Sequence, residues 1–222
     1  MQVTDAIFYV VILIMSVVIH EVAHGYTAYL CGDNTAYAQG RLTLNPLKHL
    51  DPFGSVILPL LLVLSNTGFV VGWARPVPYN PDNLRNRRTG TMLVAVAGII
   101  ANLILAIVFG LLIRFAFIFG IPSLGLDTSV IPPFYKIATI IVMVNLVLAL
   151  FNLVPIPPLD GSKVLFELLP VQWRPVLNFL ERWGMLILLF FIIFLWGMVV
   201  PFVSVMFQFL TGYPLQLLSG SF

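Results

Sequence analysis

The sequence predicts an all-α polytopic membrane protein with four to six transmembrane helices, and two observations lead to this prediction. Of the 222 residues, 60% are hydrophobic and only 9% are charged, whereas a soluble globular domain carries far more charge. The apolar residues also gather into runs close to the roughly 20 residues that a helix needs to cross a bilayer. We expect one membrane-embedded domain, residues 1–222, with a core at about 6–169 and a last transmembrane helix at about 183–210.

The first apolar run, about residues 6–30, carries the sequence H-E-V-A-H at residues 20–24. On an α-helix, His20 and His24 lie one turn apart and about 40° around the axis, so both imidazoles can face one ion. Glu21 can then reach a water molecule on that ion without being a ligand, which is the H-E-x-x-H arrangement of zinc peptidases. Polar side chains near membrane depth require a partner, and a metal ion supplies one. The motif therefore predicts His20 and His24 as metal ligands and Glu21 as the acid–base group.

The stretch after this run predicts a short β-hairpin and a segment that does not span the membrane. Polar and apolar residues alternate over 37–44, as in a strand with Leu42 on its apolar side. The next apolar run, 55–71, is short and contains Pro59. Basic residues flank it on both sides, and a spanning helix would place one of these basic loops outside. We expect 55–71 to be re-entrant or packed against the other helices.

Two further runs, from about residue 90 to 119 and from 134 to 154, are long enough to span. The first carries a stripe of mostly small residues at every fourth position, which favours close helix packing: Gly98, Asn102, Ala106 and Gly110. Asn102 is the polar member of this stripe. It either joins two helices by a hydrogen bond or faces the metal cavity, and the spacing alone does not decide between these roles.

The second of these runs leads into a proline-rich segment that ends in Asp160-Gly161. Three prolines at 155–158 cannot continue a helix, and irregular backbone at membrane depth is tolerated where it lines a cavity. Asp160 is the natural carboxylate to complete a site with two histidines and an open water position. A role as a helix N-cap is the alternative for Asp160, and His49 is the competing third ligand.

The distribution of charge predicts the orientation in the membrane. Lys and Arg gather at 41–48, at 75–88 and at 163–182, whereas 120–133 contains neither. Cytoplasmic loops carry the excess of basic residues, so both chain ends are expected outside and the basic loops inside. This count places His24 and Asp160 toward the cytoplasmic side on neighbouring passes, where they can meet.

These motifs resemble the site-2 protease family, the intramembrane zinc metalloproteases. Residues 20–24 match its metal helix, and Asn152 through Gly161 match its N-x-x-P-x-x-x-L-D-G signature. Residues 90–102 are similar to its central helix, although Ile99 stands where the family's usual motif has proline. Larger members carry a PDZ or CBS domain, so this chain is expected to be a compact form without them.

The resemblance implies cleavage of peptide bonds in or near transmembrane segments, with one Zn²⁺ per chain held by His20, His24 and Asp160. Glu21 would be catalytic, and Asn152 would stabilise the oxyanion with the zinc. The strand with Leu42 would pair with an unwound substrate, and Asn102 is a further substrate-contacting candidate. The implied partners are a transmembrane protein substrate and the lipid bilayer of a bacterial or archaeal cell membrane, without nucleic acid.

Three alternatives remain at this point. The chain could be a membrane protein that binds a metal without cleaving peptides, but such a protein has no evident use for Glu21. It could be a structural scaffold in which polar residues only join helices, and it would then bind no metal. Another class of membrane zinc peptidase would take its third ligand from a glutamate, for which Glu167 and Glu181 are the candidates.

Overall fold

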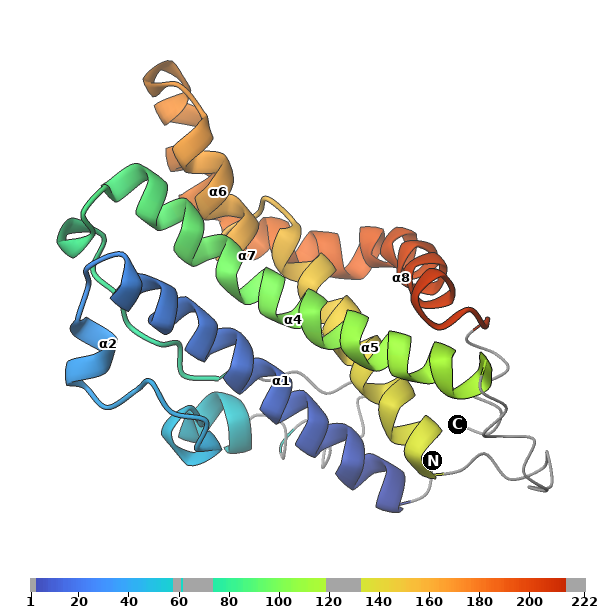
Figure 1. Ribbon diagram of the computed structural model, residues 1–222. Coiled ribbons are helices and arrows are strands. Elements are labelled where there is room, and N and C mark those ends of the chain that lie inside the picture. Colours follow the sequence, from blue (N-terminus) through green and yellow to red (C-terminus); the bar gives the residue numbers. More distant parts are fainter. Residues whose placement is uncertain (1–2, 58–60, 62–73, 119–132, 215–222) are drawn as a thin grey trace.

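The architecture is all-α in the computed structural model, which describes residues 3–57, 61, 74–118 and 133–214 (Figure 1). The helical elements follow one another along the chain in this order: α1 Val3–Leu30, α2 Thr35–Ala38, η1 Pro46–Lys48, η2 Pro52–Ile57, η3 Pro81–Asn83, α4 Arg87–Ile118, α5 Pro133–Leu153, α6 Asp160–Leu168, η5 Val171–Trp173, α7 Arg174–Phe190, η6 Phe191–Leu195 and α8 Trp196–Thr211. The predicted runs near 6–30, 90–119 and 134–154 therefore correspond to α1, α4 and α5.

The centre of the molecule is a layer of three long helices, with α4 packed against both α1 and α5 (Figure 1). The chain reverses direction between α1 and α4 and again between α4 and α5, so neighbours are antiparallel. The small-residue stripe on α4 explains the close packing, because Gly98, Asn102, Ala106 and Gly110 are all buried. Further along α4, a cluster of buried apolar side chains joins it to α5 and α8, including Ile113, Leu146 and Phe207.

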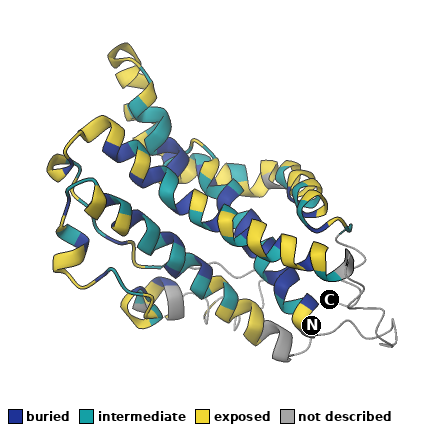
Figure 2. Ribbon diagram, in the orientation of Figure 1, coloured by how far each residue is buried: buried dark blue, intermediate teal, exposed yellow. Residues whose placement is uncertain are grey.

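Within the part of the chain that the structure describes, four helices are long and apolar enough to cross a membrane, in agreement with the lower bound of the prediction: Ile7–Leu30, Arg87–Ala116, Phe134–Leu153 and Val171–Leu195. Large apolar side chains are exposed along α1, α4, α7 and α8, and Figure 2 shows the exposed residues on the outer faces of the bundle. An apolar surface of this extent is not normal for a soluble monomer, whereas lipid covers it without penalty.

The last apolar run is predicted to form one helix at about 183–210, but the structure divides it differently. The helix α7 already begins at Arg174, and the π-helical turn η6 at Phe191–Leu195 separates it from α8. The shorter apolar helix Gly197–Thr211 contains Pro201. Proline lacks an amide hydrogen and crowds the carbonyl four residues earlier, and π-turns and prolines are the usual causes of helix breaks.

The predicted strand and hairpin at 37–44 are wrong, because the described residues contain helices and one isolated β-bridge between Leu50 and Ala74, with no strand. The first two residues of the segment belong to the helix α2, which the Asp33 carboxylate starts by accepting a hydrogen bond from the Thr35 amide. Gly40 then takes a left-handed conformation with φ of 62°, which breaks the two-residue period. Leu42 packs toward Gly25 of α1.

Two predictions concern segments of which the structure describes only a few residues. The re-entrant or packed segment 55–71 is described only at 55–57 and at residue 61, and the expected outside loop 120–133 is described only at its last residue. Both stay predictions.

The segment that follows α1 is held in place by one buried carboxylate, that of Asp33. Its side chain accepts hydrogen bonds from the Thr35 amide at 3.1 Å, the Asn80 amide at 2.7 Å and the Asn83 Nδ2 at 3.0 Å. Burial alone would raise the pKa of Asp33, but these bonds and the one from the Thr35 hydroxyl lower it below its ordinary value. Asp33 thereby joins the end of α1 to the segment around residues 80–83.

Asp33→Asn is expected to lower the stability by about 1–3 kcal/mol at pH 7, because an amide cannot accept all these hydrogen bonds. A lowered folded-state pKa contributes stability that is present above the unfolded pKa of about 3.9 and is lost as pH falls through the folded value. The wild type should lose this contribution below about pH 4, and the variant should lack that part of the pH dependence.

Thermal unfolding in detergent between pH 7 and pH 3.5 measures both effects. Asp82→Asn is the matched control, because the ion pair of Asp82 with Arg87 is exposed and such pairs contribute little. Equal melting temperatures for Asp33→Asn and wild type at pH 7 would contradict the structural role of Asp33.

Candidate metal centre

The helix α1 brings His20 and His24 onto one face, one turn apart, as their spacing predicts. Their rings meet edge to face with centroids 4.5 Å apart. The two residues are only 5% and 7% exposed, so both imidazoles are largely buried. The two Nε2 atoms lie 3.0 Å from each other and point to the same place.

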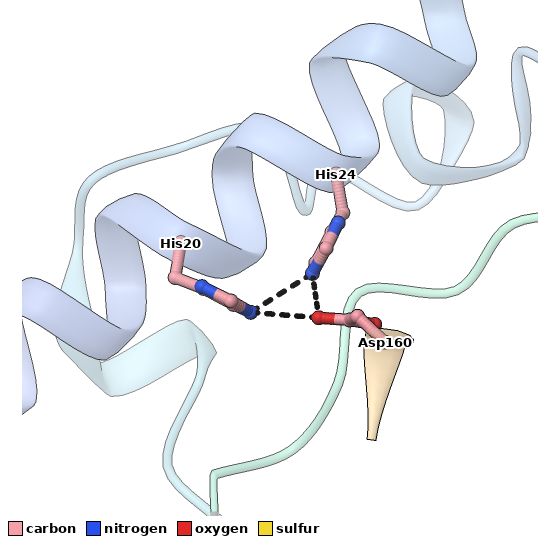
Figure 3. A group of neighbouring side chains, drawn as sticks. All are labelled: His20, His24 and Asp160. Carbon is pink, nitrogen blue, oxygen red and sulfur yellow. Dashed lines mark hydrogen bonds and ion pairs between the residues drawn. The ribbon is translucent and has the colours of Figure 1, made fainter. Parts of the chain in front are cut away.

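Asp160, the first residue of α6, completes this group from a distant part of the chain (Figure 3). Its Oδ2 lies 3.0 Å from the His20 Nε2 and 2.9 Å from the His24 Nε2. The Asp160 side chain does not cap α6, since the N-cap position belongs to Leu159 and carries no side-chain cap bond. Among the residues that the structure describes, His20, His24 and Asp160 form the group that could hold a metal ion.

The outer nitrogens of both rings are held by α4. The Nδ1 of His24 lies 2.6 Å from the Val94 carbonyl oxygen, and the Nδ1 of His20 lies 3.0 Å from the Asn102 Oδ1. A carbonyl oxygen only accepts, so the Nδ1 of His24 carries the hydrogen and donates it. The same assignment holds for His20 in the amide orientation of Asn102 found here. With Nδ1 protonated in this way, both Nε2 atoms would present lone pairs to a metal ion when the rings are neutral.

This donor set fits a divalent cation. Two imidazole nitrogens and one carboxylate oxygen face each other at 2.9–3.0 Å, an arrangement that one shared cation can hold together. Nitrogen and oxygen donors of this kind suit zinc, and three protein ligands with an open position are typical of catalytic zinc sites. A hydrogen bond from the second ring nitrogen to a carbonyl is the usual support of a metal-binding histidine.

Gly98 of α4 is what allows the two rings to sit this close to the helix. A Cβ atom at Gly98 would lie 2.6 Å from the Cε1 of His20 and equally close to the Cε1 and Nε2 of His24. Val94, Gly98 and Asn102 are spaced by four residues, so one face of α4 both holds the rings and makes room for them. We name these three residues the α4 support.

Two features fix the Asp160 side chain. A Cβ at Gly161 would overlap the Leu153 carbonyl oxygen, so the start of α6 rests directly on the end of α5. The Lys163 ammonium donates to the Asp160 Oδ1 at 2.8 Å. Burial would raise the pKa of Asp160, but its contacts with His20, His24 and Lys163 hold that pKa well below the ordinary range. Asp160 is therefore ionised at neutral pH.

A cavity of about 160 Å³ opens beside the group, lined by its three members and by Glu21, Val77, Tyr79, Asn152 and Lys163. The Glu21 Oε2 accepts a hydrogen bond from the Val77 amide at 2.8 Å. That amide belongs to an extended segment which Arg41 holds through the carbonyl oxygens of Arg75 and Pro76. Glu21 therefore stands in the cavity wall next to the histidines without joining their group.

The remaining candidates lie as follows. Asn152 lines the cavity, and its Nδ2 donates to the Leu148 carbonyl within α5. Asn102 contacts His20 from behind and does not line this cavity, so its substrate contact stays a prediction. Leu42 does not line it either. His49, the competing third ligand, is buried away from this group, with its Nε2 2.8 Å from the Thr43 carbonyl oxygen.

The sequence interpretation missed Lys163, Val77 and the role of Gly98 in the site. Lys163 could have been found, because it follows Asp160 by three residues and therefore shares its face in the first turn of a helix. Gly98 was recognised as a packing residue, but its partner could not be known without the fold. Nothing in the sequence indicates that the Val77 amide meets Glu21.

Comparisons with known proteins agree with this geometry. The model of peptidase family M50 matches residues 118–195. The candidate zinc metalloprotease YwhC of Bacillus subtilis is 42% identical over 182 residues, which are 82% of this chain and 78% of that protein. The candidate zinc metalloprotease Rip2 of Mycolicibacterium smegmatis is 32% identical over 181 residues, 81% of this chain and 64% of that protein. No solved structure gives a significant match.

Proposed function

Since this chain belongs to peptidase family M50, the site-2 protease family of zinc metalloproteases, we propose that it is an intramembrane endopeptidase. Its substrates are membrane proteins, which it cleaves in or near their transmembrane segments. One Zn²⁺ per chain is held by His20, His24 and Asp160.

One observation carries this proposal: three lone-pair donors converge at 2.9–3.0 Å beside a carboxylate that is not one of them. A carrier or scaffold needs no acid–base group at that position, whereas hydrolysis of a peptide bond does. Glu21 supplies it from the cavity wall. Neither Glu167 nor Glu181 belongs to the group that could hold a metal among the described residues, which disfavours a glutamate as the third ligand.

The placement of the site supports cleavage close to the cytoplasmic membrane surface. His24 lies near the end of α1, Val94 near the start of α4 and Asp160 just after α5, and these ends lie together because the three helices alternate in direction (Figure 1). The basic stretches 41–48 and 75–88 adjoin the same end, and the excess of basic residues favours the cytoplasm.

Different residues of the chain have different roles in the proposed hydrolysis. When bound, zinc supplies a Lewis acid that polarises the peptide carbonyl and lowers the pKa of water to about 7. Glu21 takes the proton from the attacking water onto its carboxylate and passes it to the nitrogen of the leaving amine, first as base and then as acid. Val94 and Asn102 keep the ring nitrogens of His24 and His20 turned to the site.

Asn152 is the proposed hydrogen-bond donor to the oxygen of the scissile carbonyl, where charge develops. Its Nδ2 donates one of its two hydrogens to the Leu148 carbonyl, and the second hydrogen can serve this role in the cavity that Asn152 lines. The substrate must also be unwound, because the carbonyls of an intact helix are already hydrogen-bonded along its axis. The implied partners are therefore a transmembrane protein with a helix that opens locally and the lipid bilayer.

Zinc content of the purified protein in detergent tests the metal site. We expect about one equivalent in the wild type, and loss or a sharp reduction in His24→Ala and Asp160→Ala, because each removes one of three ligands. His49→Ala is the matched control and should keep its zinc. If Asp160→Ala retains zinc and His49→Ala loses it, His49 replaces Asp160 as the third ligand. A wild type that cannot be loaded with zinc would contradict the proposal.

A further inference from the structure

The contact between Asp160 and Lys163 is not explained by the chemistry described so far. Lys163 donates from its Nζ to the Asp160 Oδ1 at 2.8 Å, while the other oxygen of the same carboxylate faces the two histidines. The two oxygens of Asp160 thus have separate partners. Lys163, three positions after the proposed ligand Asp160, also lines the cavity.

This pair differs from an ordinary surface ion pair. Exposed pairs contribute little because water screens them and because two long side chains must be ordered. Here the Asp160 side chain is only 7% exposed, and that of Lys163 is 38% exposed. The Lys163 ammonium also lies 5.9 Å from the centre of the Tyr79 ring, which lines the same cavity, within the range of a cation–π contact.

A buried carboxylate that faced the histidines alone could turn about its Cβ–Cγ bond and offer either oxygen, or both. The backbone at this point cannot adjust, because Gly161 rests against the Leu153 carbonyl and the Ser162 hydroxyl donates to the Leu159 carbonyl at 2.6 Å. The two side-chain torsions of Asp160 are the remaining freedom. Lys163 removes it by engaging Oδ1, and charge-assisted hydrogen bonds of this kind are among the strongest.

The charge of Lys163 supports the same role. Its ammonium donates to the Asp160 carboxylate at 2.8 Å, a contact that favours the charged form of both groups. Lys163 therefore stays a cation beside the site. It also cannot serve as a metal ligand itself, because a protonated amine has no lone pair.

We propose that Lys163 is a positioning residue that holds Asp160 as a one-oxygen ligand and so keeps a coordination position of the metal open for water. This inference rests on the proposed zinc site. Residues that hydrogen-bond to a ligating carboxylate typically change metal affinity by 10–100-fold when they are removed. Lys163 would do more than strengthen binding, because it also determines how many oxygens of Asp160 reach the metal.

The experiment compares wild type, Lys163→Met, Lys163→Gln and Lys163→Arg as purified full-length proteins in detergent. Zinc affinity is measured by competition with a chromophoric chelator, and the Co²⁺-loaded proteins are compared by their visible absorption. We expect the dissociation constant for zinc to rise about 10–100-fold in Lys163→Met. The Co²⁺ bands should weaken, because a two-oxygen Asp160 raises the coordination number and geometry governs these spectra. Lys163→Arg should restore both, since it keeps the charge and the donor.

Lys48→Met is the matched control, because it makes the same chemical change at the exposed last residue of η1 and should leave affinity and spectrum unchanged. If Lys163→Met does not fold, the zinc affinity and the Co²⁺ spectrum of Lys163→Gln test the inference instead. Wild-type affinity and an unchanged Co²⁺ spectrum in the neutral variants would overturn this inference and leave the zinc site intact. Failure of the wild type itself to bind zinc would instead overturn the proposed function.

Discussion

Glu21→Gln is expected to abolish peptide-bond cleavage while the zinc content stays at the wild-type value. The substitution keeps the size of the side chain but removes its ability to take up and release a proton at neutral pH. Acid–base groups of this kind contribute about 10²–10⁴-fold to rate, so residual cleavage should be at most about one hundredth of wild type. Zinc should remain because Glu21 is not part of the His20, His24 and Asp160 group.

The measurement needs cleavage and metal content from the same preparations. Protein reconstituted in lipid vesicles is incubated with a panel of single-span membrane proteins whose helices contain glycine or proline, and the products are identified by mass spectrometry. Glu181→Gln is the matched control, because it is the same change at an exposed residue. Cleavage by Glu21→Gln at the wild-type rate would refute its role, and loss of zinc would assign Glu21 to the ligands.

Gly98→Ala is expected to remove zinc from the protein through the addition of one methyl group. The new Cβ would lie 2.6 Å from ring atoms of both His20 and His24, so the rings must move. They cannot move freely, because Val94 and Asn102 on the same helix hold their outer nitrogens. We expect the zinc affinity to fall at least about tenfold, the lower end of what disturbed ligand orientation produces, and cleavage to fall with it.

The fold should survive this substitution. Alanine favours a helix over glycine by about 1 kcal/mol, which opposes any loss of packing. Gly197→Ala is the matched control, because a Cβ there meets no other atom within 4 Å, and it should bind zinc like wild type. Thermal unfolding separates a local effect from a global one. Full zinc binding by Gly98→Ala would mean that the rings have room which this structure does not show.

Features that depend on local spacing could be predicted from the sequence. The relation of His20, Glu21 and His24 follows from the geometry of a helix alone, and the bounds of α4 and α5 follow from the length of the apolar runs. Asp160 lies far from the histidines along the chain. It could be predicted because a site with two histidines lacks a ligand and because charge places the two segments on the same side.

The parts that could not be predicted depend on contacts between distant segments. The alternation at 37–44 resembles a strand, but the Asp33 carboxylate and Gly40 determine its conformation. The apolar run after residue 183 has the length of one span, yet a π-turn divides it. The closeness of Gly98 to the histidines appears only once α4 lies against α1. A stripe of small residues predicts close helix packing but does not indicate which residues of the other helix it contacts.

The α4 support also has a consequence for how the enzyme is made in the cell. The histidines lie on one helix, and the groups that orient them lie on another, which the ribosome completes many residues later. Until the second helix docks, the imidazoles are free to rotate and the metal site does not exist in an organised form. We therefore expect the chain to acquire an organised zinc site, and with it hydrolytic activity, only once the bundle has assembled.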